Sequence, residues 1–298
     1  MTAAAALARA RAAFLQACER DVAVRKPGNV SDASAGHGMQ ATLFRTSAQA
    51  AAGPLLASGA RVGQRVEAAM AATWAAAGCN TNLGILLLCA PLALAVERAP
   101  APHTAATLRQ AVAAVLESLD LADTQAVYRA IALANPGGLG SAPEQDVHSA
   151  PSVGLREAMA LAADRDRIAR QYRDGFADLF DIGLPAFLTA RENTDPAERG
   201  SSAAAVQHLY LTLLGAFPDS HIVRKQGPQM AQTVMQAAQA WLARVANQGH
   251  PLRPLDADPA WGAWDQALKD TGINPGTTAD LTVATLMLAG LLHDATPG

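Results

Sequence analysis

A short polar segment, Gly78-Cys79-Asn80-Thr81-Asn82-Leu83-Gly84, opens a long apolar run that ends at Val96. The run predicts a buried helix, and the start of a buried helix leaves several backbone N–H groups without partners. The side chains of Asn80, Thr81 and Asn82 can cap some of these donors, and the N–H groups that remain attract anions. We therefore expect a phosphate-bearing ligand to bind where this helix begins.

Two further loops combine proline, glycine and polar residues next to predicted helices. Lys26-Pro27-Gly28 follows the first predicted helix, and its lysine either meets a phosphate or belongs to an ordinary helix-ending turn. Asn274-Pro275-Gly276 precedes the last predicted helix, where Thr277 and Asp280 have the spacing of a capping box with Asp in place of Glu. The cap does not explain the Asn-Pro-Gly triplet, which indicates a second site where a ligand approaches the backbone closely.

The segment from Pro218 to Gly227 carries an acid, an imidazole and two bases within seven residues. Asp219 could hold Mg²⁺, and Arg224 and Lys225 could bind the phosphates that accompany it. The alternative is an ordinary helix start, with Asp219 or Ser220 as the N-cap and a basic surface turn after it.

Glu67 is one of few acidic residues between Asp32 and Glu97, and it lies on the alanine-rich helix that precedes the Asn-Thr-Asn segment. A solitary carboxylate in this position could act as a general base or as a metal ligand. A solvated surface glutamate explains it equally well.

A glycine-rich segment, Asn135-Pro136-Gly137-Gly138-Leu139-Gly140, is followed by Glu144-Gln145-Asp146-Val147-His148. Successive backbone N–H groups in such a loop can cradle phosphates. No Gly-Lys-Ser/Thr closes the loop and no strand precedes it, so it is neither a P-loop nor a dinucleotide-binding fingerprint. A plain connector remains the alternative.

Helical periodicity runs through nearly the whole chain, and alternating strand patterns are missing. The breakers cluster in a few loops, none of which has the length or composition of a flexible linker. We predict a single all-α domain that spans residues 1–298. The predicted helices are Ala3–Val24, Gln40–Ala57, Val62–Ala77, Leu83–Val96, Ala105–Leu119, Asp123–Ala134, Gly154–Phe180, Ser201–Ala216, Gln229–Ala246, Asp258–Asp270 and Thr278–Leu292.

The composition excludes several functional classes. Half of the 298 residues are hydrophobic, and the net charge of −3 comes without the basic stripe that nucleic-acid binding needs. The run Leu83–Val96 is too short to cross a bilayer, so no membrane partner is expected. The spacing of the three cysteines is not that of a metal site. The stretch Met1–Ala13 is interpreted as the first helix and not as a leader. We expect a cytoplasmic protein.

Together these motifs resemble the triphosphoribosyl-dephospho-CoA synthase family, and the resemblance extends from Lys26 to Leu292. Their order and spacing are much more specific than any motif alone. The matching pieces are Lys26-Pro27-Gly28, Gly63 with Glu67 and Met70, Asn80-Thr81 with Gly84, Asp219 with Arg224 and Gly227, and Asn274 to Leu281 with Asp280.

The resemblance implies an all-α enzyme that moves the triphosphoribosyl group of ATP onto an alcohol, such as the 2′-hydroxyl of 3′-dephospho-CoA, and releases adenine. Magnesium is the implied cofactor, and a homodimer is left open. In this interpretation Glu67 is the catalytic base, and Asn80 and His221 are further catalytic residues. The expected nucleotide-binding residues are Lys26, Gly28, Asn82, Gly138, Arg224, Lys225, Asn274 and Thr277, and the expected metal ligands are Asp219, Asp280 and Asp146.

The chain departs from the family pattern at one place. The citrate-lyase branch has Asn-Thr-His-Lys-Gly, where this chain has Asn82-Leu83 in the position of the His-Lys pair. The sequence looks more like a divergent branch found in archaea and methylotrophic bacteria. The acceptor therefore stays open, and a ribityl alcohol in tetrahydromethanopterin biosynthesis is an alternative. A magnesium-dependent ADP-ribosyl-type hydrolase and a non-catalytic nucleotide-binding helical protein are the other hypotheses.

Overall fold

The structure is a computed structural model that describes residues 2–99, 103–135, 147, 149–198, 200, 202–249 and 251–292. Within these residues the chain forms fourteen α-helices, one π-helix and one 3₁₀ helix, and its β-type pairings are isolated bridges only. The predicted all-α fold is confirmed. Among the helices in the described ranges, none is both long enough and apolar enough to cross a membrane.

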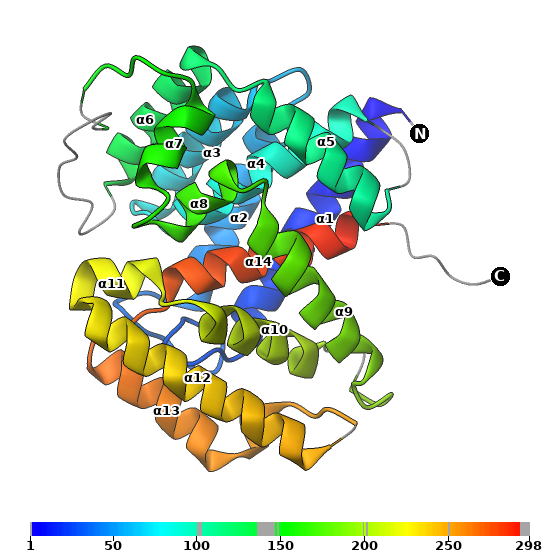
Figure 1. The fold of residues 1–298 in the computed structure, drawn as a ribbon, viewed down its shortest axis with the longest axis vertical. Helices are drawn as coiled ribbons and strands as arrows, with labels where there is room; N and C mark the ends of the chain where they lie inside the picture. The colour runs from blue at the N-terminus through cyan, green and yellow to red at the C-terminus, as the bar shows by residue number, and fades with distance from the viewer. Residues whose placement is uncertain are drawn as a thin grey trace.

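Eight helices form the group drawn at the top of Figure 1, with the C-terminal helix α14 beneath them. They are α1 (Ala3–Ala23), α2 (Ala41–Leu55), α3 (Val62–Ala77), α4 (Leu83–Arg98), α5 (Ala105–Glu117), α6 (Leu121–Ala134), α7 (Leu155–Ala162) and α8 (Arg167–Arg173).

The remaining elements run back under this group and end in α14. They are the π-helix η1 (Asp178–Gly183), α9 (Leu184–Glu192), α10 (Ala203–Ala216), α11 (Ser220–Gln226), α12 (Pro228–Gln248), the 3₁₀ turn η2 (Leu255–Ala257), α13 (Pro259–Asp270) and α14 (Gly276–Leu291).

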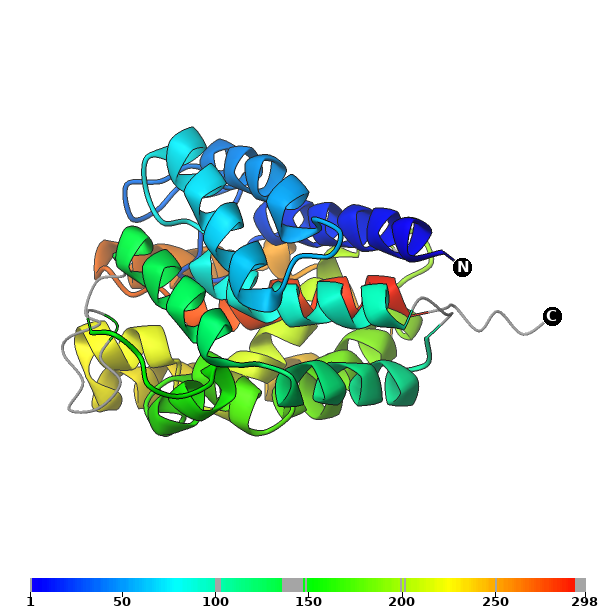
Figure 2. The same cartoon turned by 90° about the horizontal axis from the view of Figure 1, so that it is seen from above.

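Helices α4 and α14 pack against each other at the centre of the molecule (Figures 1 and 2). Most of their side chains are buried on every face, which is what helices with so few polar residues require. Small residues let α14 approach its neighbours: a Cβ on Gly290 would lie 3.0 Å from the Cβ of Ala13 in α1. The hydroxyl groups of Thr282 and Thr285 donate to carbonyls of their own helix, so these two polar groups are paired despite their burial.

The predicted helix Gly154–Phe180 is wrong, because the structure divides this stretch into α7, α8 and η1. Asp166 starts a new helix by accepting hydrogen bonds from the N–H groups of Ile168 and Ala169. Gly175 and Phe176 then adopt positive φ angles, which a continuing helix does not allow. Helices α9 and α11 were not predicted at all, while the other predicted helices agree with the structure to within a few residues.

The two Pro-Gly loops, which are distant in sequence, contact each other. The side-chain amide of Asn29 donates to Oδ1 of Asn274 at 3.1 Å, and the N–H of Gly28 donates to Oδ1 of Asp265 at 2.9 Å. Gly28 has φ +80°, and a Cβ there would lie 2.8 Å from Cδ of Pro275. The glycine is thus required both by the backbone conformation and by the close approach of the second loop.

Gly28→Ala is expected to lower the free energy of unfolding by about 1–3 kcal/mol, because a left-handed backbone and a steric clash are imposed together. Urea unfolding measures this change. Gly59→Ala is the matched control, since Gly59 has φ +74° and open space around its missing Cβ. Equal losses in the two variants would show that the contact between the loops contributes nothing.

Candidate active site

A cavity of about 740 Å³ lies where the N-terminal ends of α4 and α14 meet α3, α6, α7, α8 and α11. Its lining brings together most of the residues that the sequence singled out. They are Asn80, Asn82, Gly84, His221, Arg224, Lys225, Asn274, Thr277 and Asp280.

The start of α4 supplies backbone donors to this cavity. Oδ1 of Asn80 accepts the N–H of Leu83 at 3.1 Å, so the predicted cap is confirmed for this residue. Thr81 instead donates to the hydroxyl of Ser47 at 2.7 Å. In the described part of the chain, the N–H groups of Gly84 and Ile85 find no acceptor, as is usual in the first turn of a helix. They are therefore available to an anion.

Asn82 is the N-cap residue of α4, but its side chain caps nothing. The residue is only 5% exposed, and neither its Oδ1 nor its Nδ2 has a hydrogen-bond partner. A buried amide without partners is costly, so this side chain is suited to a polar ligand in the cavity.

Asp280 projects from α14 onto the first turn of α4. A Cβ on Gly84 would lie 2.0 Å from Oδ2 of Asp280, so only glycine leaves room for this carboxyl group. Burial raises the pKa of Asp280 well above its usual range, and the nearby carboxylates of Asp21, Asp219 and Asp166 raise it further. Within the described residues the carboxyl group forms no hydrogen bond or ion pair, which leaves it free for a ligand.

This orientation overturns the predicted capping box of Thr277 and Asp280. The N-cap residue of α14 is Pro275, which provides no capping side chain, and Asp219 accepts the N–H of Thr278 in the first turn instead. Asp280 contacts α4 instead, while Thr277 is buried and lines the cavity.

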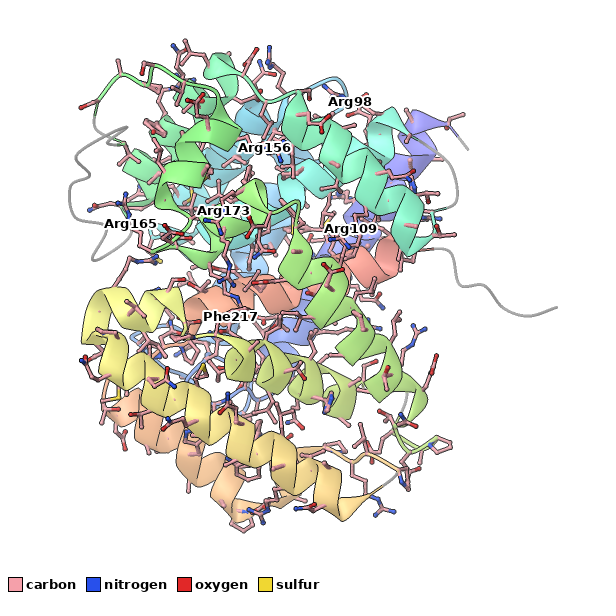
Figure 3. The ribbon with its side chains drawn as sticks, viewed as in Figure 1. Arg98, Arg109, Arg156, Arg165, Arg173 and Phe217 are labelled. Carbon is pink, nitrogen blue, oxygen red and sulfur yellow. The ribbon has the colours of Figure 1, made fainter. Side chains whose placement is uncertain are left out.

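Three basic side chains, Arg165, Arg224 and Lys225, line the same cavity and are here called the cationic group. Nη1 of Arg224 donates to Oδ2 of Asp166 at 2.7 Å, which fixes the guanidinium, while its Nε has no partner. Arg165 and Lys225 are exposed and have no ion-pair partner in the part of the chain that is described. Figure 3 shows Arg165 at the turn between α7 and α8, above α11 in that view.

His221 lies in the first turn of α11 and packs against the loop before α14. A Cβ on Gly276 would lie 3.2 Å from its Nδ1, so the glycine makes room for the ring. Burial lowers the pKa of His221 to about 4, and the charges of Lys225 and Arg224 act in the same direction. The ring is therefore neutral at pH 7, and its Nε2 has no hydrogen-bond partner.

Asp219 is fully occupied by hydrogen bonds within the protein. Oδ1 accepts the N–H groups of His221 and Ile222 at 2.8 and 3.1 Å, and Oδ2 accepts the N–H and the hydroxyl of Thr278, both at 2.7 Å. The residue is fully buried and does not line the cavity. Its geometry favours the N-cap alternative over metal binding, because its oxygens already bind four donors.

Three other predicted site residues, Lys26, Gly28 and Glu67, lie away from the cavity lining. Gly28 donates its N–H to Asp265 and packs against Pro275. Lys26 is fully buried, forms an ion pair with Asp21 at 3.1 Å and donates to the backbone oxygen of Asp21, so its ammonium is already neutralised. Glu67 lies on α3 and forms a bidentate pair with Arg129 at 2.6 and 2.8 Å. Gly138 and Asp146 fall outside the described residues.

Two features of the lining could not be recognised from the sequence. Arg165 belongs to a run of alternating acids and bases that is typical of a solvated helix face, and only the turn before α8 directs it to the cavity. The second feature is a set of apolar residues from α3, α6 and α7, which are indistinguishable in sequence from ordinary core positions. Within the described residues, no three His, Cys, Asp or Glu side chains gather into a metal site.

A cavity between helix ends, lined by basic side chains, a neutral imidazole and a free carboxyl group, suits a helical enzyme that acts on nucleotides. Residues 7–297 match the family model described as ATP:dephospho-CoA triphosphoribosyl transferase, and the chain belongs to this family. The family consists of transferases that use ATP to transfer a triphosphoribosyl group to dephospho-CoA. The predicted family is thereby confirmed, while the archaeal and methylotroph-like branch stays a prediction.

A solved structure supports the fold. The chain resembles a protein from Archaeoglobus fulgidus that is described provisionally as a triphosphoribosyl-dephospho-CoA synthase, with a TM-score of 0.62 and 24% sequence identity. The match covers 83% of this chain and 96% of the archaeal chain. A comparison with curated protein sequences gives no match.

Glu67→Gln is expected to leave the rate of adenine formation within about twofold of the wild-type rate. Glu67 is engaged by Arg129 on the protein surface, and a surface pair of this kind contributes only about 0–1 kcal/mol to stability. Steady-state assays with ATP and dephospho-CoA measure the effect. A loss of a hundredfold or more would return Glu67 to the catalytic machinery.

His221 should make the protein less stable as the pH falls. The unfolded chain takes up a proton near pH 6.5, whereas the folded protein resists protonation of His221 down to about pH 4. Stability contributed by the neutral ring is therefore present above pH 6.5 and declines between about pH 6.5 and 4. Urea unfolding of His221→Gln across this range should show a smaller decline than the wild type. An identical decline in both proteins would contradict the buried, neutral state.

Proposed function

We propose that the cavity binds ATP and transfers its triphosphoribosyl group to a hydroxyl of dephospho-CoA, with release of adenine. The observation that carries this proposal is the free carboxyl group of Asp280, which lies against the first turn of α4 in the cavity that the cationic group also lines. Opposite charges and free backbone donors around one cavity suit a phosphorylated sugar that must be both neutralised and oriented.

The triphosphate is assigned to the cationic group and to the first turn of α4. Arg224 offers a guanidinium that Asp166 already holds in place, which reduces the entropy lost on binding. Lys225 and Arg165 add exposed positive charges to the lining of the same cavity. The free N–H groups of Gly84 and Ile85 then bind the part of the nucleotide nearest the helix start.

Asp280 would hold the magnesium ion that accompanies the nucleotide. Protein sites of this kind usually contribute one or two carboxylates, and the phosphates supply further oxygens. Asp280 fits because its carboxyl group has no protein partner in the described chain. Burial, and to a lesser degree the neighbouring carboxylates, raise its pKa, and a bound cation would favour the ionised form. When bound, the ion neutralises phosphate charge.

The chemistry is glycosyl transfer at C1′ of the ribose. The acceptor oxygen forms a bond to C1′ while the bond from C1′ to N9 of adenine breaks, through a transition state with oxocarbenium character. The hydroxyl group loses its proton, and the departing adenine carries away the electron pair and takes up one proton.

His221 is assigned the role of accepting the hydroxyl proton. Its ring is neutral at pH 7, and its Nε2 is free of partners within the protein. A base with a low pKa is effective here because the hydroxyl becomes strongly acidic as its oxygen bonds to C1′. This role replaces the one predicted for Glu67, which does not line the cavity. Asn80 keeps the role of capping α4, and Asn82, Asn274 and Thr277 remain the residues expected to orient the nucleotide.

Asp280→Asn is expected to reduce kcat by about a hundredfold or more, the scale seen when one preorganised polar group is removed from an active site. The magnesium concentration that gives half-maximal rate should rise at the same time. Mass spectrometry of adenine and of the acceptor product, with ATP and dephospho-CoA as substrates, provides the measurement.

Asp270→Asn is the matched control, because Asp270 lies at the end of α13, outside the cavity lining. This variant should keep both the wild-type rate and the wild-type magnesium dependence. If Asp280→Asn behaves like the control, the carboxyl group of Asp280 has no part in the reaction.

A further inference from the structure

One side of the cavity is apolar and is not used by the proposed phosphate site. We call this side the apolar wall. It consists of Trp74 from α3, Tyr128, Ile131 and Ala134 from α6, and Leu155, Ala158, Met159, Leu161 and Ala162 from α7.

The apolar wall differs in charge from the rest of the lining. None of its nine side chains is charged, and only Tyr128 and Trp74 carry a polar atom. All charged residues of the lining come from other elements, including the cationic group and Asp280. A ligand that fills the whole cavity must therefore be charged at one end and uncharged at the other.

The outer part of the apolar wall is incompletely covered by the protein. Leu161 is 49% exposed and Trp74 is 37% exposed, although both line the cavity. By contrast, Leu155 and Met159 are buried deeper in the wall. A bound apolar group would remove the exposed carbon atoms from water, which favours binding.

ATP accounts for only part of this distribution. Its triphosphate and its ribose belong at the charged end, beside the cationic group and the start of α4, and its uncharged adenine can contact only a part of the apolar wall, which is formed by three helices. The cavity volume of about 740 Å³ lies in the upper part of the usual range for small-molecule sites, which leaves room for a second substrate. That substrate must place its hydroxyl near the charged end and an uncharged portion along the apolar wall.

We propose that the apolar wall binds the uncharged arm of the acceptor and thereby selects acceptors that carry one. This inference rests on the proposed function. In dephospho-CoA the pantetheine arm is uncharged and consists mainly of methyl, methylene and amide groups. A ribityl chain fits poorly, because the wall offers its several hydroxyl groups almost no hydrogen-bond partners.

Binding of dephospho-CoA and of ADP, each measured by calorimetry without ATP, tests this proposal. The two ligands share adenosine and a diphosphate, and only dephospho-CoA has the arm. The wild-type protein should bind dephospho-CoA at least tenfold more tightly than ADP. Leu161→Asn and Trp74→Gln should each lower this ratio about three- to tenfold and leave the affinity for ADP unchanged. Both residues are partly exposed, so the variants are expected to fold.

Leu133→Asn is the matched control, because Leu133 is 38% exposed on α6 and does not line the cavity. It should leave both affinities unchanged. The proposal is overturned if dephospho-CoA does not bind, if its advantage over ADP is absent, or if the wall variants weaken both ligands equally. Failure of the proposed function has a different signature, since binding would then follow the expected pattern while ATP and dephospho-CoA give no transfer product.

Discussion

The buried carboxylate of Asp219 joins the two helix starts that build the charged end of the cavity. Its four hydrogen bonds run to the first turn of α11 on one side and to Thr278 of α14 on the other. Burial raises the pKa of Asp219, and these bonds oppose the rise by favouring the ionised form. Since α11 carries His221 and two of the three residues of the cationic group, and α14 carries Asp280, their mutual placement depends on this one side chain.

Glycines complete the arrangement by leaving space beside the functional side chains. Gly84 accommodates the carboxyl group of Asp280, and Gly276 accommodates the ring of His221. A methyl group in either position would push the functional side chain away from its present place. These two glycines therefore belong to the site, although neither supplies a reactive group. They show how a tightly packed helical protein can bring polar groups together between helices that are otherwise apolar.

The sequence predicted the helical fold well, because long apolar periodicity determines which faces are buried. It also identified the cap at Asn80 and the polar loops around the cavity. It failed for Glu67 and Lys26, whose partners Arg129 and Asp21 come from the folded arrangement of side chains. Few other acidic residues lie near Glu67 in the sequence, so its carboxylate was expected to be free for catalysis. In the folded chain, Arg129 of α6 forms an ion pair with it. Whether a charged group is free or already paired depends on tertiary contacts that local patterns do not contain.

The departure from the family pattern at Asn82-Leu83 can be understood in the same physical terms. Leu83 is buried in the lining of the cavity, so a cation is missing from the start of α4. The positive charges that line the cavity come instead from the α7–α8 turn and from α11, as Arg165, Arg224 and Lys225. Phosphate binding needs charge of the right sign within reach, and several helix ends can supply it. If the cavity binds a nucleotide as proposed, residues at one helix start can change while positive charges from other helix ends still neutralise its phosphates.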